Sequence, residues 1–263
     1  MQRRTLILAL ILTLLAAVPI VYAYDLWMET WTEDNIVIAG DLSYNYWLVT
    51  RDDSETNVTF SYAVSDGVLN INCSRTGTIS DLKHFAIERK IDLADLTSAV
   101  FETKVKLNIS NSAYLHITIK NSSSSATYLT LELRGFSGDQ QFKVYYYNSS
   151  ELYDSITIMS SVPRDEWHTL KAEIDNRTIY IYYDDAIKAE LTTSKDLEDY
   201  DEIIIDYYIA TSATQDYPHQ VYIDYIGFKT QFYDPALTNA FIQLAITLAM
   251  IGIALSFVKR AIR

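Results

Sequence analysis

Hydrophobic and polar residues alternate with a period of two along most of the chain, from residue 36 to residue 228. The alternation occurs in short runs rich in β-branched and aromatic residues, which is typical of strands that bury one face. The runs are 59–64, 68–72, 85–91, 99–108, 113–120, 127–134, 142–147, 155–159, 167–174, 178–183, 187–191, 203–209 and 220–228. Only 92–98 and 195–201 suggest short helical or irregular connections. So many strands without regular helices predict an antiparallel all-β sandwich or barrel.

Turn signals fall between these runs. Asp66-Gly67 lies between two of them and predicts a tight hairpin, and Asp175-Asn176-Arg177 and Asp184-Asp185 occupy equivalent places. No internal repeat or linker divides this part of the chain. We therefore predict one domain, residues 24–230.

The N-terminal end has the pattern of a secretory signal. Arg3 and Arg4 precede an uncharged stretch, 5–18, and Val21 and Ala23 are small or apolar residues at the −3 and −1 positions of a cleavage site before Tyr24. We predict a signal peptide over 1–23. An uncleaved membrane anchor is the alternative.

The C-terminal end contains a second uncharged block, 236–258, which is followed by three basic residues: Lys259, Arg260 and Arg263. A helix needs about 20 apolar residues to cross the hydrocarbon core, and flanking basic residues mark the cytoplasmic side. We predict a connector at 231–235, a transmembrane helix over 236–258 and a cytoplasmic tail at 259–263. The protein would be a single-pass membrane protein whose bulk lies outside the cell.

Composition narrows the class of partner. The chain is 49% hydrophobic and 13% aromatic, which excludes a disordered protein, and its net charge is −13. All 34 acidic residues lie between Asp25 and Asp234. A surface of that sign repels phosphate backbones, so nucleic acid is excluded as a partner.

Sequons support the extracellular placement. Candidate N-glycosylation sites are Asn57, Asn72, Asn108, Asn121, Asn148 and Asn176.

Cys73 is the single cysteine and cannot form an internal disulfide, which favours a packing role.

Several of the predicted strands carry residues of a known family. The stretch 165–175, DEWHTLKAEID, followed by 178–184, TIYIYYD, resembles a strand pair of concanavalin A-like and laminin G-like jelly rolls. The stretch 221–228, VYIDYIGF, resembles the closing strand of that family, and 65–71, SDGVLNI, resembles an early hairpin. The resemblance implies a jelly-roll β-sandwich but no particular function. One departure is Asp184-Asp185, where the family usually has Asp-Gly.

Some relatives in this fold cleave glucans with an E-x-D-x-E strand, which places alternate carboxylates on one face. Glu173-Ile174-Asp175 is the nearest match, but its third position is Arg177, and Glu132-Leu133-Arg134 fits no better because Arg134 takes the place of the second acid. We therefore assign no catalytic residue and favour a protein that is not an enzyme.

The histidines His84, His116, His168 and His219 lack zinc-ligand spacing.

Calcium is the better metal hypothesis. Many jelly-roll relatives bind a structural calcium, and Asp224 in the closing strand resembles an aspartate that sometimes contributes. Asp41 lies near the opening strand and is the second candidate ligand. The alternative is that the acidic residues only keep the domain soluble.

Aromatic residues on strands form the candidate ligand surface. Tyrosine occurs 21 times, and exposed rings on neighbouring strands would stack on sugar rings or contact a protein. The candidates are Tyr145, Tyr147, Tyr180, Tyr182 and Trp167. The alternative is that these rings only fill the sheet, because tyrosine is also a good strand former.

The preferred function is a membrane-anchored cell-surface glycoprotein with a lectin-like, non-catalytic domain that binds a glycan or a partner protein. A membrane-tethered glycoside hydrolase or lyase is the second hypothesis, and a structural envelope subunit is the third.

Overall fold

The computed structural model describes residues 22–32, 35–93, 96–109, 112–124, 126–136, 139–210 and 219–232. The chain forms two compact units, and the larger one, Asp25–Lys229, contains nearly all of the described residues. Apart from Tyr22 and Ala23, the predicted signal peptide lies outside the described residues, as does the predicted transmembrane segment 236–258. Within the described ranges, no helix has the length and hydrophobicity needed to span a membrane.

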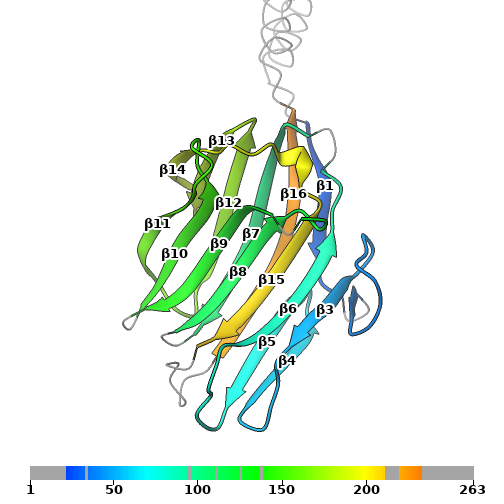
Figure 1. Cartoon of the computed structure of the whole chain (residues 1–263), viewed down its shortest axis with the longest axis vertical. Helices are drawn as coiled ribbons and strands as arrows, with labels where there is room; N and C mark the ends of the chain where they lie inside the picture. The colour runs from blue at the N-terminus through cyan, green and yellow to red at the C-terminus, as the bar shows by residue number, and fades with distance from the viewer. Residues whose placement is uncertain are drawn as a thin grey trace, which may run out of the picture. The chain divides into compact units, whose positions relative to one another are not determined.

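The first sheet, sheet A, contains eight strands (Figure 1). Its order is β14 (Ala186–Thr192), β13 (Thr178–Tyr183), β12 (Trp167–Asp175), β7 (Ser98–Asn108), β16 (His219–Phe232), β5 (Val68–Arg75) and β4 (Val58–Ser65), and β1 (Tyr22–Thr30) also pairs with β16. The path from β14 to β4 is antiparallel throughout.

The second sheet, sheet B, also has eight strands. Its order is β11 (Tyr153–Val162), β10 (Asp139–Tyr147), β9 (Thr127–Phe136), β8 (Ala113–Lys120), β15 (Glu202–Ile209), β6 (Lys83–Lys90), β3 (Trp47–Asp52) and β2 (Ile36–Val37). Only the short β2–β3 pair in this sheet is parallel. A short 3-10 helix, η2 (Leu197–Asp199), precedes β15.

The thirteen predicted runs coincide with β4 to β16, so the prediction of an antiparallel all-β sandwich is confirmed. The sequence pattern did not predict β1, β2 or β3. The first strand-like run begins at residue 59, so no run covers these three strands, and β2 is only two residues long.

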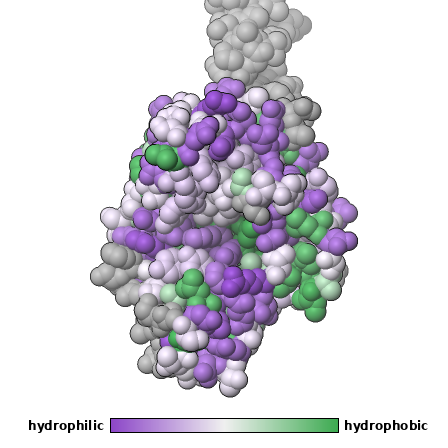
Figure 2. Space-filling view, viewed as in Figure 1, coloured by the Kyte–Doolittle hydropathy of each residue, from purple (hydrophilic) through white to green (hydrophobic). Residues whose placement is uncertain are grey.

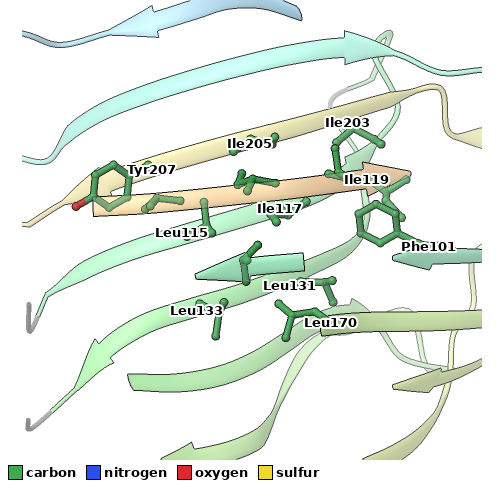
Figure 3. Close-up of a cluster of buried hydrophobic side chains, with 14 of the residues drawn as sticks. Phe101, Leu115, Ile117, Ile119, Leu131, Leu133, Leu170, Ile203, Ile205 and Tyr207 are labelled. Carbon is green, nitrogen blue, oxygen red and sulfur yellow. The ribbon is translucent and has the colours of Figure 1, made fainter. Parts of the chain in front are cut away.

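The two sheets pack face to face through the alternate residues of their strands (Figure 3). On sheet B the contact side chains include Leu115 and Ile117 of β8 and Leu131 of β9, and they meet Phe101 of β7 and Leu170 of β12, all at most 1% exposed. The other face of each central strand is half-buried. Hydrophilic and intermediate residues predominate on the side of the molecule shown in Figure 2, and hydrophobic residues there form small groups.

Gly227 lies where two strands approach closely. A β-carbon at this position would collide with the backbone oxygen of Trp27 and would lie 2.9 Å from the Cα of Met28. Glycine in β16 therefore allows β1 to pack against the closing strand.

The predicted tight turns have the expected left-handed backbone. Asp66 and Gly67 have φ of 53° and 75°, and Asp184 and Asp185 have φ of 47° and 63°. Asp184 is held in place because its carboxylate accepts a hydrogen bond from the backbone N–H of Thr169 and lies 2.9 Å from Nδ1 of His168.

We expect Asp185→Gly to raise the free energy of unfolding by about 0.5–1 kcal/mol, since glycine adopts a left-handed φ without steric strain. Chemical denaturation measures this difference. Asp184→Gly is the control, and it should destabilise because it removes the bonds to Thr169 and His168. A destabilised Asp185→Gly protein would contradict the interpretation.

Candidate functional site

Seven aromatic side chains form a continuous row across the outer face of sheet B, and we call them the aromatic row. Its first five members, in spatial order, are Tyr147, Tyr153, Tyr145, His116 and Tyr208. The other two, Tyr114 and His84, both contact Tyr208. Successive ring centroids are 4.7–6.3 Å apart. The row runs from β11 at the sheet edge to β6, about 24 Å at the usual strand spacing.

Strand register brings these residues together. His116 of β8 lies opposite Glu132 of β9 on one side and Asp206 of β15 on the other. Two residues further along β15, Tyr208 lies opposite Tyr114 of β8 on one side and His84 of β6 on the other. Because side chains alternate along a strand, all of these point away from the core that their neighbours fill.

Glu132 lies at the centre of the row and is only 2% exposed. His116 Nε2 is 2.7 Å from its Oε2, and the Tyr145 hydroxyl is 3.3 Å from both of its oxygens. Arg134 Nε is 3.8 Å from Oε1. The carboxyl group therefore has several donors around it, as a buried acid requires.

The phenols near Glu132 remain protonated at neutral pH. Burial, followed by the charge of Glu132, raises the pKa of Tyr145 and of Tyr208 above the ordinary tyrosine value. The Tyr208 hydroxyl lies 3.3 Å from His116 Nε2. The Tyr145 hydroxyl can therefore donate to Glu132, and either hydroxyl can donate to a ligand.

A second carboxyl group faces the same surface. Both oxygens of Asp206 lie 3.0 Å from Nδ1 of His84. Asp206 and Glu132 flank β8 in the same register, so their Cα atoms are about 10 Å apart at the usual strand spacing.

Glu88, Glu202 and Lys120 form a third group of charged residues on this face. Lys120 Nζ is 3.4 Å from Glu202 and 3.8 Å from Glu88. Burial, followed by the hydrogen bond and charge of Glu88, raises the pKa of Glu202 to about 8 against the opposing effect of Lys120. Glu202 therefore carries a proton near neutral pH.

This pKa predicts a pH-dependent stability. Between the ordinary value of 4.5 and about 8 the folded chain binds more protons at Glu202 than the unfolded chain. Its contribution to stability is therefore lost as pH rises through that window. From pH 5 to pH 8.5 we expect Glu202→Gln to gain up to roughly 4 kcal/mol in stability relative to the unaltered protein, about 1.4 kcal/mol for each pH unit of the window. Urea denaturation across this range, with the exposed Glu198→Gln as control, measures the gain, and an equal pH profile for all three proteins would contradict it.

The structure divides the five predicted ligand residues between opposite faces. Tyr145 and Tyr147 belong to the aromatic row, whereas Trp167, Tyr180 and Tyr182 lie on the outer face of sheet A. They therefore cannot form one binding stripe. Trp167 is 38% exposed and contacts the ammonium groups of Lys104 and Lys106.

The remaining members of the row were not predicted as ligand residues. Alternation along β8, β9 and β15 was a signal that His116, Glu132 and Tyr208 point outward. The sequence did not show that β8 lies between β9 and β15, and so it could not place the three side chains together.

The structure also locates the two partial matches to the E-x-D-x-E pattern. Thr130, Glu132 and Arg134 are the alternate outward residues of β9, so one position of three carries a carboxylate. Glu173 lies on sheet A, where it accepts a hydrogen bond from the Tyr182 hydroxyl.

The proposed calcium ligands do not come together as a site. Asp224 forms an ion pair with Lys104 at 2.7 Å, and Asp41 is an exposed residue between β2 and β3. Across the described ranges, no group of three or more His, Cys, Asp or Glu residues is arranged to hold a metal ion. Calcium binding by Asp41 and Asp224 remains a prediction.

The six sequons differ in exposure. Asn57 and Asn176 are exposed, and Asn72, Asn108, Asn121 and Asn148 are half-buried. The Asn121 amide donates to the backbone oxygen of Asp199, and the Asn148 side-chain oxygen accepts from the backbone of Ser150 and Leu152. Asn57 and Asn176 are thus the most accessible candidates.

The sequence matches no protein-family model and no curated protein. The fold does match solved structures. A laminarinase (endo-1,3-β-glucanase) catalytic domain from Thermotoga petrophila has a TM-score of 0.55 at 13% identity, covering 81% of this chain and 100% of that one. A laminarinase from Rhodothermus marinus has a TM-score of 0.54 at 13% identity, covering 80% and 96%. A GlcNAcα1-4Gal-releasing endo-β-galactosidase from Clostridium perfringens has a TM-score of 0.54 at 12% identity, covering 80% and 62%. At 12–13% identity, these similarities show that the chain shares the β-sandwich fold of these structures.

Proposed function

We propose that the protein is a carbohydrate-active jelly roll that takes a glycan along the aromatic row and cleaves it as a glycoside hydrolase. The similarity to laminarinases and to an endo-β-galactosidase favours this hypothesis over the non-catalytic one that the sequence alone favoured. Flat aromatic side chains at the surface of a sheet suit the apolar faces of sugar rings.

The observation that carries the proposal is the position of Glu132. A carboxyl group lies in the middle of the row, surrounded by Tyr145, His116 and Arg134. Glycoside hydrolysis requires two carboxyl groups about 5–10 Å apart. Asp206, across His116, is the candidate for the second group, and its Cα lies about 10 Å from that of Glu132 at the usual strand spacing.

Non-catalytic glycan binding is the second candidate, and a specific observation favours it. Only one alternate position of β9 carries a carboxylate, and both Glu132 and Asp206 are engaged by a histidine. Such a face would hold a sugar without a free acid or base.

Further parts of the proposal come from the sequence. We place the domain outside the cell, anchored by residues 236–258 after removal of 1–23, with glycans on some sequons. Calcium binding by Asp41 and Asp224 stays a prediction. A protein partner and a structural envelope role are the remaining alternatives.

The test uses the full chain in a mild detergent with a panel that includes laminarin, galactan and mucin-type glycans, in calcium and in chelator. Release of reducing ends would support hydrolysis. Binding without release would favour the second candidate. If the protein neither bound nor cleaved any of these polymers, a carbohydrate function would be overturned.

A further inference from the structure

We propose that the glycan is anionic, and that Lys143 and Lys195 bind its carboxylate or sulfate groups at the β11 end of the aromatic row. The inference rests on the proposed function, because it names the substrate class of the same site.

The two lysines flank a group of three tyrosines. Lys143 Nζ lies 5.7 Å from the ring centroid of Tyr145, and Lys195 Nζ lies 5.2 Å from that of Tyr147. Both of these rings contact Tyr153, at 5.9 and 5.2 Å. Two ammonium groups and three rings therefore form one surface at the edge of sheet B.

Neither lysine has an acidic partner among the residues that the structure describes, since no carboxylate there lies within 4 Å of either ammonium group. The lysines on the outer face of sheet A are different: Lys104 pairs with Asp224, Lys106 with Asp165, Lys171 with Glu173 and Lys229 with Glu102, at 2.7–3.6 Å. In a chain of net charge −13, Lys143 and Lys195 lie over tyrosine rings at the candidate site without such a partner.

Two neighbouring acids are already engaged elsewhere. Glu132 lies opposite Lys143 in the β9–β10 register, but its oxygens face His116 and Tyr145. Asp196, next to Lys195, makes two 2.9 Å bonds to the Arg177 guanidinium. The positive charge of both lysines therefore remains available to a ligand.

An anionic polysaccharide fits this surface. A sugar ring stacks on a tyrosine, and a carboxylate or sulfate on that ring reaches an ammonium group beside it. The overall negative charge of the protein opposes binding only over a distance of about 10 Å or less at 0.1 M salt, so the local cations decide the preference.

The test compares the full chain with Lys143→Gln/Lys195→Gln, and with Lys188→Gln as control, since Lys188 is exposed on β14 and lies outside the row. The probes are polygalacturonate and its methyl ester, and dextran sulfate and dextran, in calcium-free buffer, with laminarin as a neutral polymer. A preference between the two acidic polymers distinguishes carboxylate from sulfate.

We expect the acidic polymers to bind more tightly than their neutral counterparts. The double variant should bind them about fivefold to tenfold more weakly, with unchanged binding of neutral polymers, and the loss should shrink at 0.5 M salt. Equal affinity for acidic and neutral polymers, or no effect of the double variant, would overturn this inference and leave the proposed function in place. Absence of binding to every polymer would overturn the proposed function itself.

Discussion

Arg89→Met should lower the free energy of unfolding by about 3–5 kcal/mol, because it leaves the buried Glu29 carboxylate without its cation. Arg89 and Glu29 are 9% and 3% exposed and form a buried ion pair between β6 and β1. Arg89 also donates to the backbone oxygen of Tyr44 at 2.6 and 3.0 Å and stacks on Trp27. Equilibrium urea denaturation measures the loss.

The double variant Arg89→Met/Glu29→Leu is the matched control. Replacing both members of a buried ion pair by apolar residues is often neutral, so most of the lost stability should return. The loss in Arg89→Met should also be smaller at pH 4 than at pH 7, because an unpaired buried carboxyl has a raised pKa and takes up a proton more readily. Equal stability of Arg89→Met and the unaltered protein would show that this pair does not stabilise the fold.

The strands could be predicted because burial acts locally. In β12, His168, Leu170, Ala172 and Ile174 are all buried, as the alternation predicted, and Trp167 on the opposite face is partly exposed. The order of strands in a sheet depends on contacts between distant segments, and no local pattern encodes it. The family resemblance implied a β-sandwich fold, but its motifs covered mainly β5, β12, β13 and β16 and gave no complete strand order.

The candidate site depends on this missing order. The pairs His116–Glu132 and His84–Asp206 span 16 and 122 residues of sequence. The sequence shows the runs of tyrosines but not the sheet on which each one lies. For this reason Tyr145 was grouped with Tyr180, which belongs to the opposite sheet. The Arg89–Glu29 pair was equally hidden, because β1 shows too little alternation to be recognised as a strand.

Glu132→Gln should reduce the release of reducing ends by about a thousandfold while glycan affinity stays within a factor of about three. The amide has the size of the carboxyl group and keeps an oxygen that accepts from Tyr145, but it can neither transfer a proton nor act as a nucleophile. A loss in kcat without a matching change in binding therefore identifies a group that acts in the reaction. Progress curves on the polymer that the unaltered protein cleaves best, with affinity from calorimetry, separate the two effects.

Glu173→Gln provides the matched control, because Glu173 is also a partly buried sheet carboxyl that accepts from a tyrosine, Tyr182, and lies 3.3 Å from Lys171. It is on the outer face of sheet A, so its replacement should leave product release unchanged. Full activity in Glu132→Gln would remove Glu132 from the mechanism, and loss of activity in both variants with a lower melting temperature would indicate a folding defect.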